Sequence, residues 1–128
     1  MQRVTGIGGI FFKSRDPAAL AAWYREHLGF AIEDWGGAVF AWQGAHNPQG
    51  IGTTLWSPFA ADTAYFEPSR EPWMLNLRVA DLDSLLAALR AEGCAVDERM
   101  EVSEFGRFGW VMDPEGRRIE LWQPPAGR

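Results

Sequence analysis

The chain contains an internal repeat, and this repeat limits the folds that it can adopt. Asp16 and Asp81 each precede a stretch with helical spacing. The dipeptide Leu-Trp occurs at 55–56 and again at 121–122, and a proline follows two positions later in both places. The two aspartates are separated along the chain by almost the same number of residues as the two dipeptides, 65 against 66. Since these signals mark opposite ends of the repeated unit, their agreement indicates a duplicated module.

The first copy begins with a glycine-rich apolar stretch. Residues 4–13 predict a strand, and glycine inside a strand pattern indicates a bulge or the close approach of another group. Asp16 and Pro17 suit the N-cap and first turn of a helix, which Gly29 ends. The other elements expected in this copy are strands at 30–35, 38–43 and 51–57, with a hairpin turn at Gly36-Gly37 and a loop at 44–50.

The second copy repeats this order after a linker at 58–70 that is rich in Pro, Ala and Ser. Asp81 is expected to cap a second helix that ends at Gly93. The strands expected here are 72–79, 94–102, 107–112 and 117–122, the last two joined by the turn Asp113-Pro114-Glu115-Gly116. The chain is therefore predicted to be one α+β domain, 1–128, built from two βαβββ modules at about 1–57 and 71–123.

Alternation along the strands predicts which side chains face the helices. Leu75, Leu77 and Val79 form an aliphatic set that should pack beneath a helix, which leaves Met74 and Asn76 on the opposite face. If the sheet curls, this opposite face surrounds a cleft. The side chains expected to face the cleft are Phe11, Lys13, Thr54, Trp56, Met74, Asn76, Arg78, Glu120 and Trp122.

Composition excludes several classes of partner. The net charge is -5, and Lys13 is the single lysine, which argues against nucleic acid because phosphates require clustered basic residues. No apolar run approaches the length of a membrane span, so a cytosolic protein is the default expectation. The single cysteine excludes an intramolecular disulfide. The seven tryptophans fit either a large core or a pocket with aromatic walls.

Three stretches together resemble the vicinal oxygen chelate superfamily, which includes glyoxalase I, bleomycin-resistance proteins and extradiol dioxygenases. They are Asp16-Pro17 at the helix start, the segment 24–30 (YREHLGF) at its end, and the segment 113–121 (DPEGRRIEL) near the end of the chain. The resemblance covers nearly the whole chain. It implies that each βαβββ module forms half of a curved mixed sheet, that the concave face holds the site, and that the protein pairs as a homodimer.

The same resemblance implies four positions for metal ligands in the members that use a metal. In this chain these positions hold Gly9, Thr54, Met74 and Glu120. Only Glu120 is a suitable ligand, because glycine has no side chain, a thioether is too soft for Mg, Mn or Fe(II), and a neutral hydroxyl is a weak donor. His27 lies in the last helical turn and His46 in a loop, so neither completes a site. We therefore expect no metal and no other cofactor.

Two roles are open for Glu120. An ion pair with Arg78 or Arg118 would tether strands, whereas a functional Glu120 would accept a ligand's donor or act as a general base with a raised pKa. Trp56 and Trp122 would either sandwich a flat ligand or fill the cavity. The favoured function is metal-independent binding of a small, partly aromatic molecule. The alternative is a lyase, isomerase or dioxygenase of the superfamily that uses Glu120 as a base or in a residual metal site.

Overall fold

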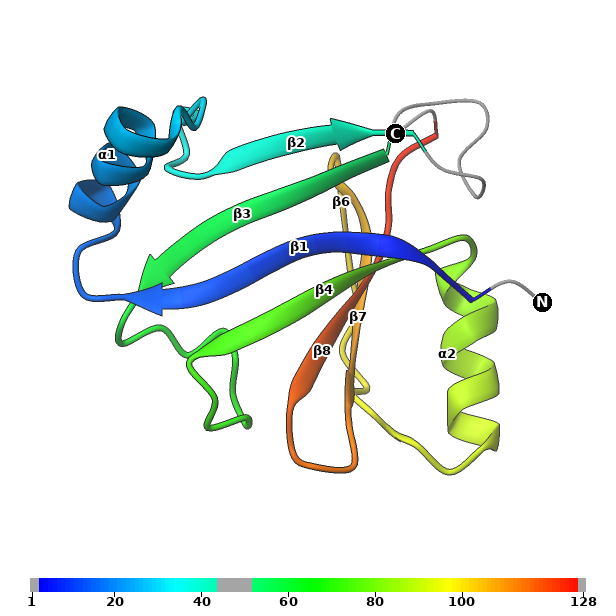
Figure 1. The fold of residues 1–128 in the computed structure, drawn as a ribbon. Helices are drawn as coiled ribbons and strands as arrows, with labels where there is room; N and C mark the ends of the chain where they lie inside the picture. Colours follow the sequence, from blue (N-terminus) through cyan, green and yellow to red (C-terminus); the bar gives the residue numbers. More distant parts are fainter. Residues whose placement is uncertain (1–2, 44–51, 127–128) are drawn as a thin grey trace.

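The computed structural model describes residues 3–43 and 52–126 (Figure 1). Its strands form one mixed sheet in the order β2-β3-β1-β4-β8-β7-β5, and β6 pairs with β7. The elements are β1 (Val4–Ser14), α1 (Pro17–Leu28), β2 (Ala38–Trp42), β3 (Gly52–Ala60), β4 (Trp73–Val79), α2 (Leu82–Ala91), β5 (Ala95–Val96), β6 (Glu101–Ser103), β7 (Gly106–Met112) and β8 (Arg118–Gln123). Of the described residues, no helix is long and apolar enough to cross a membrane.

The two halves meet edge to edge at the middle of the sheet. β1 runs antiparallel to β4, with Ile10 opposite Leu75 and Phe11 opposite Met74. Within each half the first strand pairs in parallel with the last, β1 with β3 and β4 with β8. Figure 1 shows α1 beside β2 and β3, and α2 at the other end of the sheet. The predicted α+β fold class, with a mixed sheet, is confirmed.

Both helices begin where their aspartates predict. The Asp16 carboxylate accepts a hydrogen bond from the Ala19 backbone N–H at 3.1 Å, and that of Asp81 accepts one from Ser84 at 3.2 Å. Each bond satisfies a donor that the first helical turn leaves without a partner. Gly29 ends α1 in the left-handed conformation, with φ of 72°, which glycine adopts without strain.

The face of the sheet beneath α2 carries an aliphatic core. Val79 and Leu121 are buried there against Leu82, Leu85 and Leu86 of the helix. Leu77 and Ile119 pack against the same cluster, as the alternation predicts. The other face of β4, β7 and β8, which carries Asn76, Glu120 and Trp110 and which we call the concave face, holds the candidate site.

The predicted strand at 30–35 is wrong, because this segment forms a turn. The Glu33 N–H donates to the Gly37 carbonyl at 2.7 Å, and the Gly36 N–H donates to the Glu33 carbonyl at 2.9 Å. Phe30 packs against Tyr24 and Trp56 instead of joining the sheet. The first half is therefore β-α-β-β in its described residues. The predicted loop at 44–50 lies outside them.

Two further strand boundaries differ from the prediction. The segment 94–102 is divided into β5 and β6, both of which pair with β7. Between them the Arg99 backbone N–H donates a hydrogen bond to the Asp97 carboxylate, which stabilises a turn. β3 continues to Ala60, because residues 57–60 pair with β1, so the connection between the halves begins at 61.

The bulge predicted from the glycines of the first strand is confirmed. The register between β1 and β4 shifts between Val4 and Gly6 and again between Ile7 and Gly9. A Cβ on Gly8 would clash with Asn76 Oδ1 and would lie 2.8 Å from the Trp122 ring. Gly8 therefore leaves room for side chains of the concave face.

Gly106, at the start of β7, is expected to tolerate no side chain. Its φ is 119°, and a Cβ there would clash with the Gln123 carbonyl oxygen of the neighbouring strand. We expect Gly106→Ala to lower the free energy of unfolding by about 3 kcal/mol, from backbone strain and overpacking together. Gly116 is the matched control, because it has φ of 83° but nothing within 4 Å. Gly116→Ala should cost only about 1 kcal/mol. Equal losses in urea denaturation would contradict this explanation.

Candidate functional site

Three neighbouring strands place Glu120 at the centre of the concave face. Glu120 lies in β8, directly opposite Asn76 of β4 on one side and Trp110 of β7 on the other. Residues in register on adjacent strands point to the same side of a sheet. The three side chains therefore converge, and each is at most 2% exposed.

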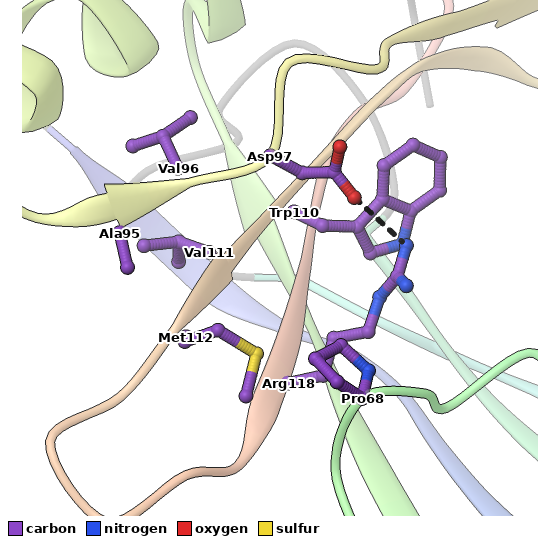
Figure 2. Close-up of a pocket in the computed structure, with 8 residues that line it drawn as sticks. All are labelled: Pro68, Ala95, Val96, Asp97, Trp110, Val111, Met112 and Arg118. Atoms are coloured by element: carbon purple, nitrogen blue, oxygen red, sulfur yellow. Dashed lines mark ion pairs between the residues drawn. The ribbon is translucent and has the colours of Figure 1, made fainter.

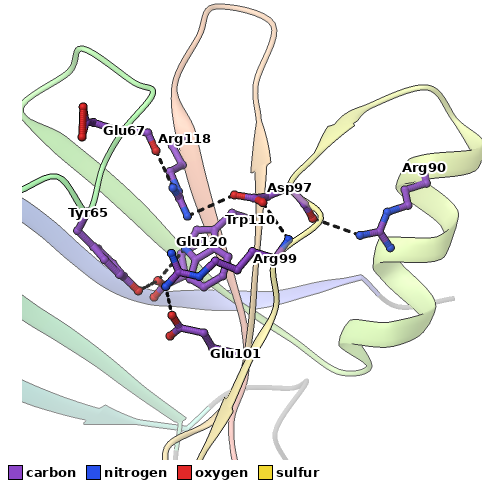
Figure 3. Close-up of polar contacts among 9 residues, drawn as sticks. All are labelled: Tyr65, Glu67, Arg90, Asp97, Arg99, Glu101, Trp110, Arg118 and Glu120. Carbon is purple, nitrogen blue, oxygen red and sulfur yellow. Dashed lines mark hydrogen bonds and ion pairs between the residues drawn. The ribbon is translucent and has the colours of Figure 1, made fainter.

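The Glu120 carboxylate accepts hydrogen bonds from three neutral donors, of which Figure 3 shows Tyr65 and Trp110. Asn76 Nδ2 donates to Oε1 at 2.6 Å, and Trp110 Nε1 donates to Oε2 at 3.0 Å. The Tyr65 hydroxyl also donates to Oε2. A buried carboxylate requires such partners, since its burial without them is costly.

Burial raises the pKa of Glu120 above its ordinary value, although its three hydrogen bonds and the charge of Arg118 act in the opposite direction. Burial also raises the pKa of Tyr65, and the Glu120 charge raises it further. Tyr65 therefore stays protonated at neutral pH and serves as a donor. Because Glu120 is 1% exposed, a substrate reaches it as a base only if a covering group moves.

That covering group is the segment 61–72 between β3 and β4, which we call the strap. Its residue Phe66 is fully buried against Phe11, Met74 and Trp110. Tyr65 stacks on Phe59 with ring centroids 5.6 Å apart and reaches Glu120. The strap, predicted as a linker only, thus fills the centre of the concave face. Phe11 and Met74, both predicted to face the cleft, pack against Phe66 of the strap. Lys13 Nζ lies 5.9 Å from the Phe66 ring centroid.

The predicted arginine partners of Glu120 lie elsewhere. The Arg78 guanidinium sits between Trp42 and Trp122, 5.5 and 5.2 Å from their ring centroids, and Nη1 donates to Thr53 at 3.3 Å. Burial lowers the pKa of Arg78. Arg118 lies over the Trp110 ring, at 4.8 Å, and acts on Glu120 through its charge. The predicted ion pair between Glu120 and an arginine is therefore wrong. Among the described residues, the hydrogen bonds of the Glu120 carboxylate come from neutral groups.

Trp56 does not face the concave side. Its ring packs against Phe12, Tyr24 and Phe30 on the side that carries α1. Thr54 donates to the Ile7 carbonyl at 2.5 Å and accepts from Trp42 Nε1 at 2.8 Å. Trp122 does lie on the concave side, where its ring stacks on that of Phe108 with the ring centroids 6.2 Å apart. The ligand-binding role of all these residues stays a prediction.

Strand register explains why the alignment of the two repeats predicted the wrong face for Trp56. Phe11 takes the place of Asn76 in the first half when the two helix caps are aligned. Asn76 pairs with Glu120, whereas Phe11 pairs with Ser57, so Ser57 instead of Thr54 corresponds to Glu120. The shift from Thr54 to Ser57 is odd, and an odd shift moves every side chain to the opposite face. Leu55 accordingly joins the concave cluster, while Leu121 packs beneath α2.

The four positions implied for a metal do not fit a divalent ion. Gly9 offers no side chain, the Thr54 hydroxyl is engaged by Trp42 and Ile7, and Met74 is packed in the aromatic cluster. Both Glu120 oxygens accept hydrogen bonds. Across 3–43 and 52–126, no group of three or more His, Cys, Asp or Glu side chains is placed to hold a metal. His27 is exposed beside Trp23. His46 lies outside the described residues.

A pocket of about 280 Å³ opens where β5 pairs with β7 in the second half (Figure 2). Arg118, Trp110 and Met112 form part of its wall, and they come from the same face as Glu120. Pro68 of the strap and Asp97 are exposed and lie at its rim. The remaining lining residues are Ala95, Val96 and Val111. This pocket lies directly beyond the indole that holds Glu120, and none of the residues predicted to bind a ligand lines it.

Sequence patterns placed neither Trp110 nor Tyr65 beside Glu120. The turn predicted at Asp113 to Gly116 would pair Met112 with Arg117, whereas the structure pairs Met112 with Arg118 and so brings Trp110 opposite Glu120. Tyr65 belongs to a segment without regular structure, so no periodicity indicates where its side chain points.

The chain belongs to the glyoxalase-like family, whose domain model matches residues 9–122. Solved structures of the same superfamily share the fold, as the sequence resemblance indicated. No curated protein matches the chain at a significant level.

A methylmalonyl-CoA epimerase in complex with methylmalonyl-CoA and NH4+ matches with a TM-score of 0.67 at 22% identity, covering 98% of both chains. The methylmalonyl-CoA epimerase from Mycobacterium tuberculosis matches with a TM-score of 0.62 at 23% identity, covering 95% of this chain and 89% of that one. A glyoxalase/bleomycin resistance protein/dioxygenase superfamily member from Vibrio splendidus 12B01 matches with a TM-score of 0.59 at 13% identity, covering 93% and 99%. These identities establish the fold alone.

Proposed function

We propose that the protein binds a small, partly aromatic molecule in the pocket beside Trp110, without a metal. The pocket itself carries this proposal. Its volume of about 280 Å³ suits a small ring compound, and apolar side chains dominate its lining. Arg118 supplies a polar group that would orient such a ligand.

The state of Glu120 supports the metal-independent form of this proposal. Its two oxygens serve as acceptors for Tyr65, Asn76 and Trp110, and these bonds hold the wall of the pocket and the strap together. A carboxylate that links three segments in this way contributes to the site as a structural anchor.

We expect ligand binding to be unaffected by chelation. Protein treated with EDTA and then dialysed should bind the same members of a small aromatic fragment library, with the same dissociation constants, as untreated protein in isothermal titration. Elemental analysis of untagged protein is the parallel measurement. Stoichiometric metal together with a loss of binding after EDTA treatment would contradict the proposal.

A second candidate function is catalysis by Glu120. Its raised pKa and its contact with the Tyr65 hydroxyl favour this candidate, since a buried carboxyl group beside a second titratable group is typical of acid–base sites. Several structural neighbours are described as epimerases. Displacement of the strap would have to precede the reaction. If a screen finds an activity, Glu120→Gln should lower kcat by at least about 100-fold, and an unchanged kcat would eliminate the catalytic role.

We also propose that the protein forms a homodimer, as its superfamily resemblance implies. Sedimentation equilibrium should then give about twice the chain mass of 14.3 kDa. A mass equal to that of one chain at all concentrations tested would contradict the proposal.

A further inference from the structure

The Arg118 guanidinium in the pocket wall has donors that the protein leaves unused. The Arg118 residue is only 8% exposed. Nη1 donates to the Glu67 carbonyl at 2.6 Å, and Nη2 lies 3.7 Å from Asp97 Oδ2, which is too long for a good hydrogen bond. The Nε–H finds no acceptor among the described residues. The Nε–H is itself closed to solvent, so Nη2 is the donor that an acceptor entering the pocket would reach, and such an acceptor would be stabilised there.

Around this charge the pocket is apolar and large enough for a ring. Met112, Val96 and Val111 present carbon on one side, and Pro68 closes another (Figure 2). An engineered cavity of about 150 Å³ is enough to bind benzene, so 280 Å³ accommodates a substituted ring. The competing charge, Asp97, has a side chain that is 40% exposed and therefore screened by water. It also accepts the Arg99 backbone N–H at 2.9 Å.

We infer that the ligand of this pocket is a small aromatic acid, with its carboxylate against Arg118 and its ring on Met112 and Pro68. This inference names the ligand class for the site and rests on the proposed function. Guanidinium and carboxylate are both planar and form charge-assisted hydrogen bonds in pairs, so a carboxylate suits the unused donors better than a neutral carbonyl group does.

Three probes of similar size test the charge of the ligand. Benzoate, benzamide and benzylamine are titrated separately into the full chain labelled with ¹⁵N, and chemical shifts are followed by NMR. We expect benzoate to perturb the amides of Ala95, Val96 and Met112 and the Trp110 indole. Its dissociation constant should be about ten-fold or more lower than that of benzamide. Benzylamine should bind weakest, because Arg118 repels it. If benzamide or benzylamine binds the pocket as tightly as benzoate, the inference is overturned.

Two variants locate the binding, and a third tests the donor pair. Ala95→Phe places a ring in the pocket from its exposed rim without removing a charged group, and it should weaken benzoate binding by about ten-fold or more. Ala91→Phe is the matched control, because Ala91 is also exposed but does not line the pocket, and it should leave the dissociation constant unchanged. Arg118→Lys keeps the positive charge but removes the planar donor pair, and it should weaken benzoate while leaving benzamide nearly unaffected. Equal benzoate affinity in Ala95→Phe and Ala91→Phe overturns the inference.

The outcomes separate this inference from the proposed function. If neutral aromatic fragments bind the pocket and benzoate does not, the proposed metal-independent binding stands, but the inference that the ligand is an aromatic acid is wrong. If benzoate binds only after metal is added, metal-independent binding fails as well. If none of the three probes perturbs the pocket amides, the aromatic acid is wrong, and the broader fragment library decides the proposed function.

Discussion

Replacement of Trp110 by alanine is expected to lower the free energy of unfolding by about 3–5 kcal/mol, because a large buried side chain is removed from the concave core. The indole is 1% exposed and packs in the cluster with Phe11, Phe66 and Met74. Its removal also takes one donor from Glu120. Urea denaturation followed by far-ultraviolet circular dichroism measures the loss.

Two comparison variants separate the packing of Trp110 from its hydrogen bond. Trp110→Phe keeps a ring but removes the Nε1 donor, and it should cost about 1–3 kcal/mol. Trp35→Ala is the exposure control: this indole is 51% exposed, so its loss should be no more than about 1 kcal/mol. If Trp110→Ala is no more destabilising than Trp35→Ala, then the concave cluster does not stabilise the fold in the way described.

Loss of the Glu120 side chain should be nearly as damaging. Glu120→Ala leaves the donors of Tyr65, Asn76 and Trp110 buried without their acceptor, at a cost of about 3 kcal/mol or more. Glu120→Gln keeps the shape and one acceptor oxygen, so its loss at neutral pH should be clearly smaller. Glu120→Ala thus removes both acceptor oxygens, whereas Glu120→Gln removes the charge and one of them.

The same Glu120→Gln variant gives an expected pH dependence. The pKa of Glu120 in the folded state is raised above the ordinary value of 4.5. The folded state thus holds this proton more tightly than the unfolded chain, and the related stability is fully present below pH 4.5 and lost as the pH rises through the folded-state pKa. Wild type should lose stability relative to Glu120→Gln as the pH increases over this range.

Other carboxyl groups cancel in that comparison, because both proteins contain them. Asp81 and Asp113 have lowered pKa values and stabilise the fold in the opposite direction, equally in both. A wild type that gains stability relative to Glu120→Gln with rising pH would show that the three donors outweigh burial at Glu120.

Local signals in the sequence were sufficient for most of the fold. Asp16 and Asp81 start the helices because a carboxylate can satisfy the first-turn N–H groups, and Gly29 ends one because its φ is positive. Strand alternation placed Leu77 and Val79 beneath α2. The segment 30–35 was mispredicted, because an apolar stretch forms a strand only where a neighbouring strand is available to bond it.

The sequence by itself determined the duplicated architecture, the family and the position of Glu120 on the inner face of the last strand. These depend on caps, turns and periodicity, which act over a few residues. Only the tertiary structure decided what surrounds Glu120. Tyr65 arrives from the strap, far from Glu120 along the chain, and the register of β3 turns Trp56 to the outer face. Such contacts depend on how separate segments pack in space, and a shift of one residue in pairing reverses them.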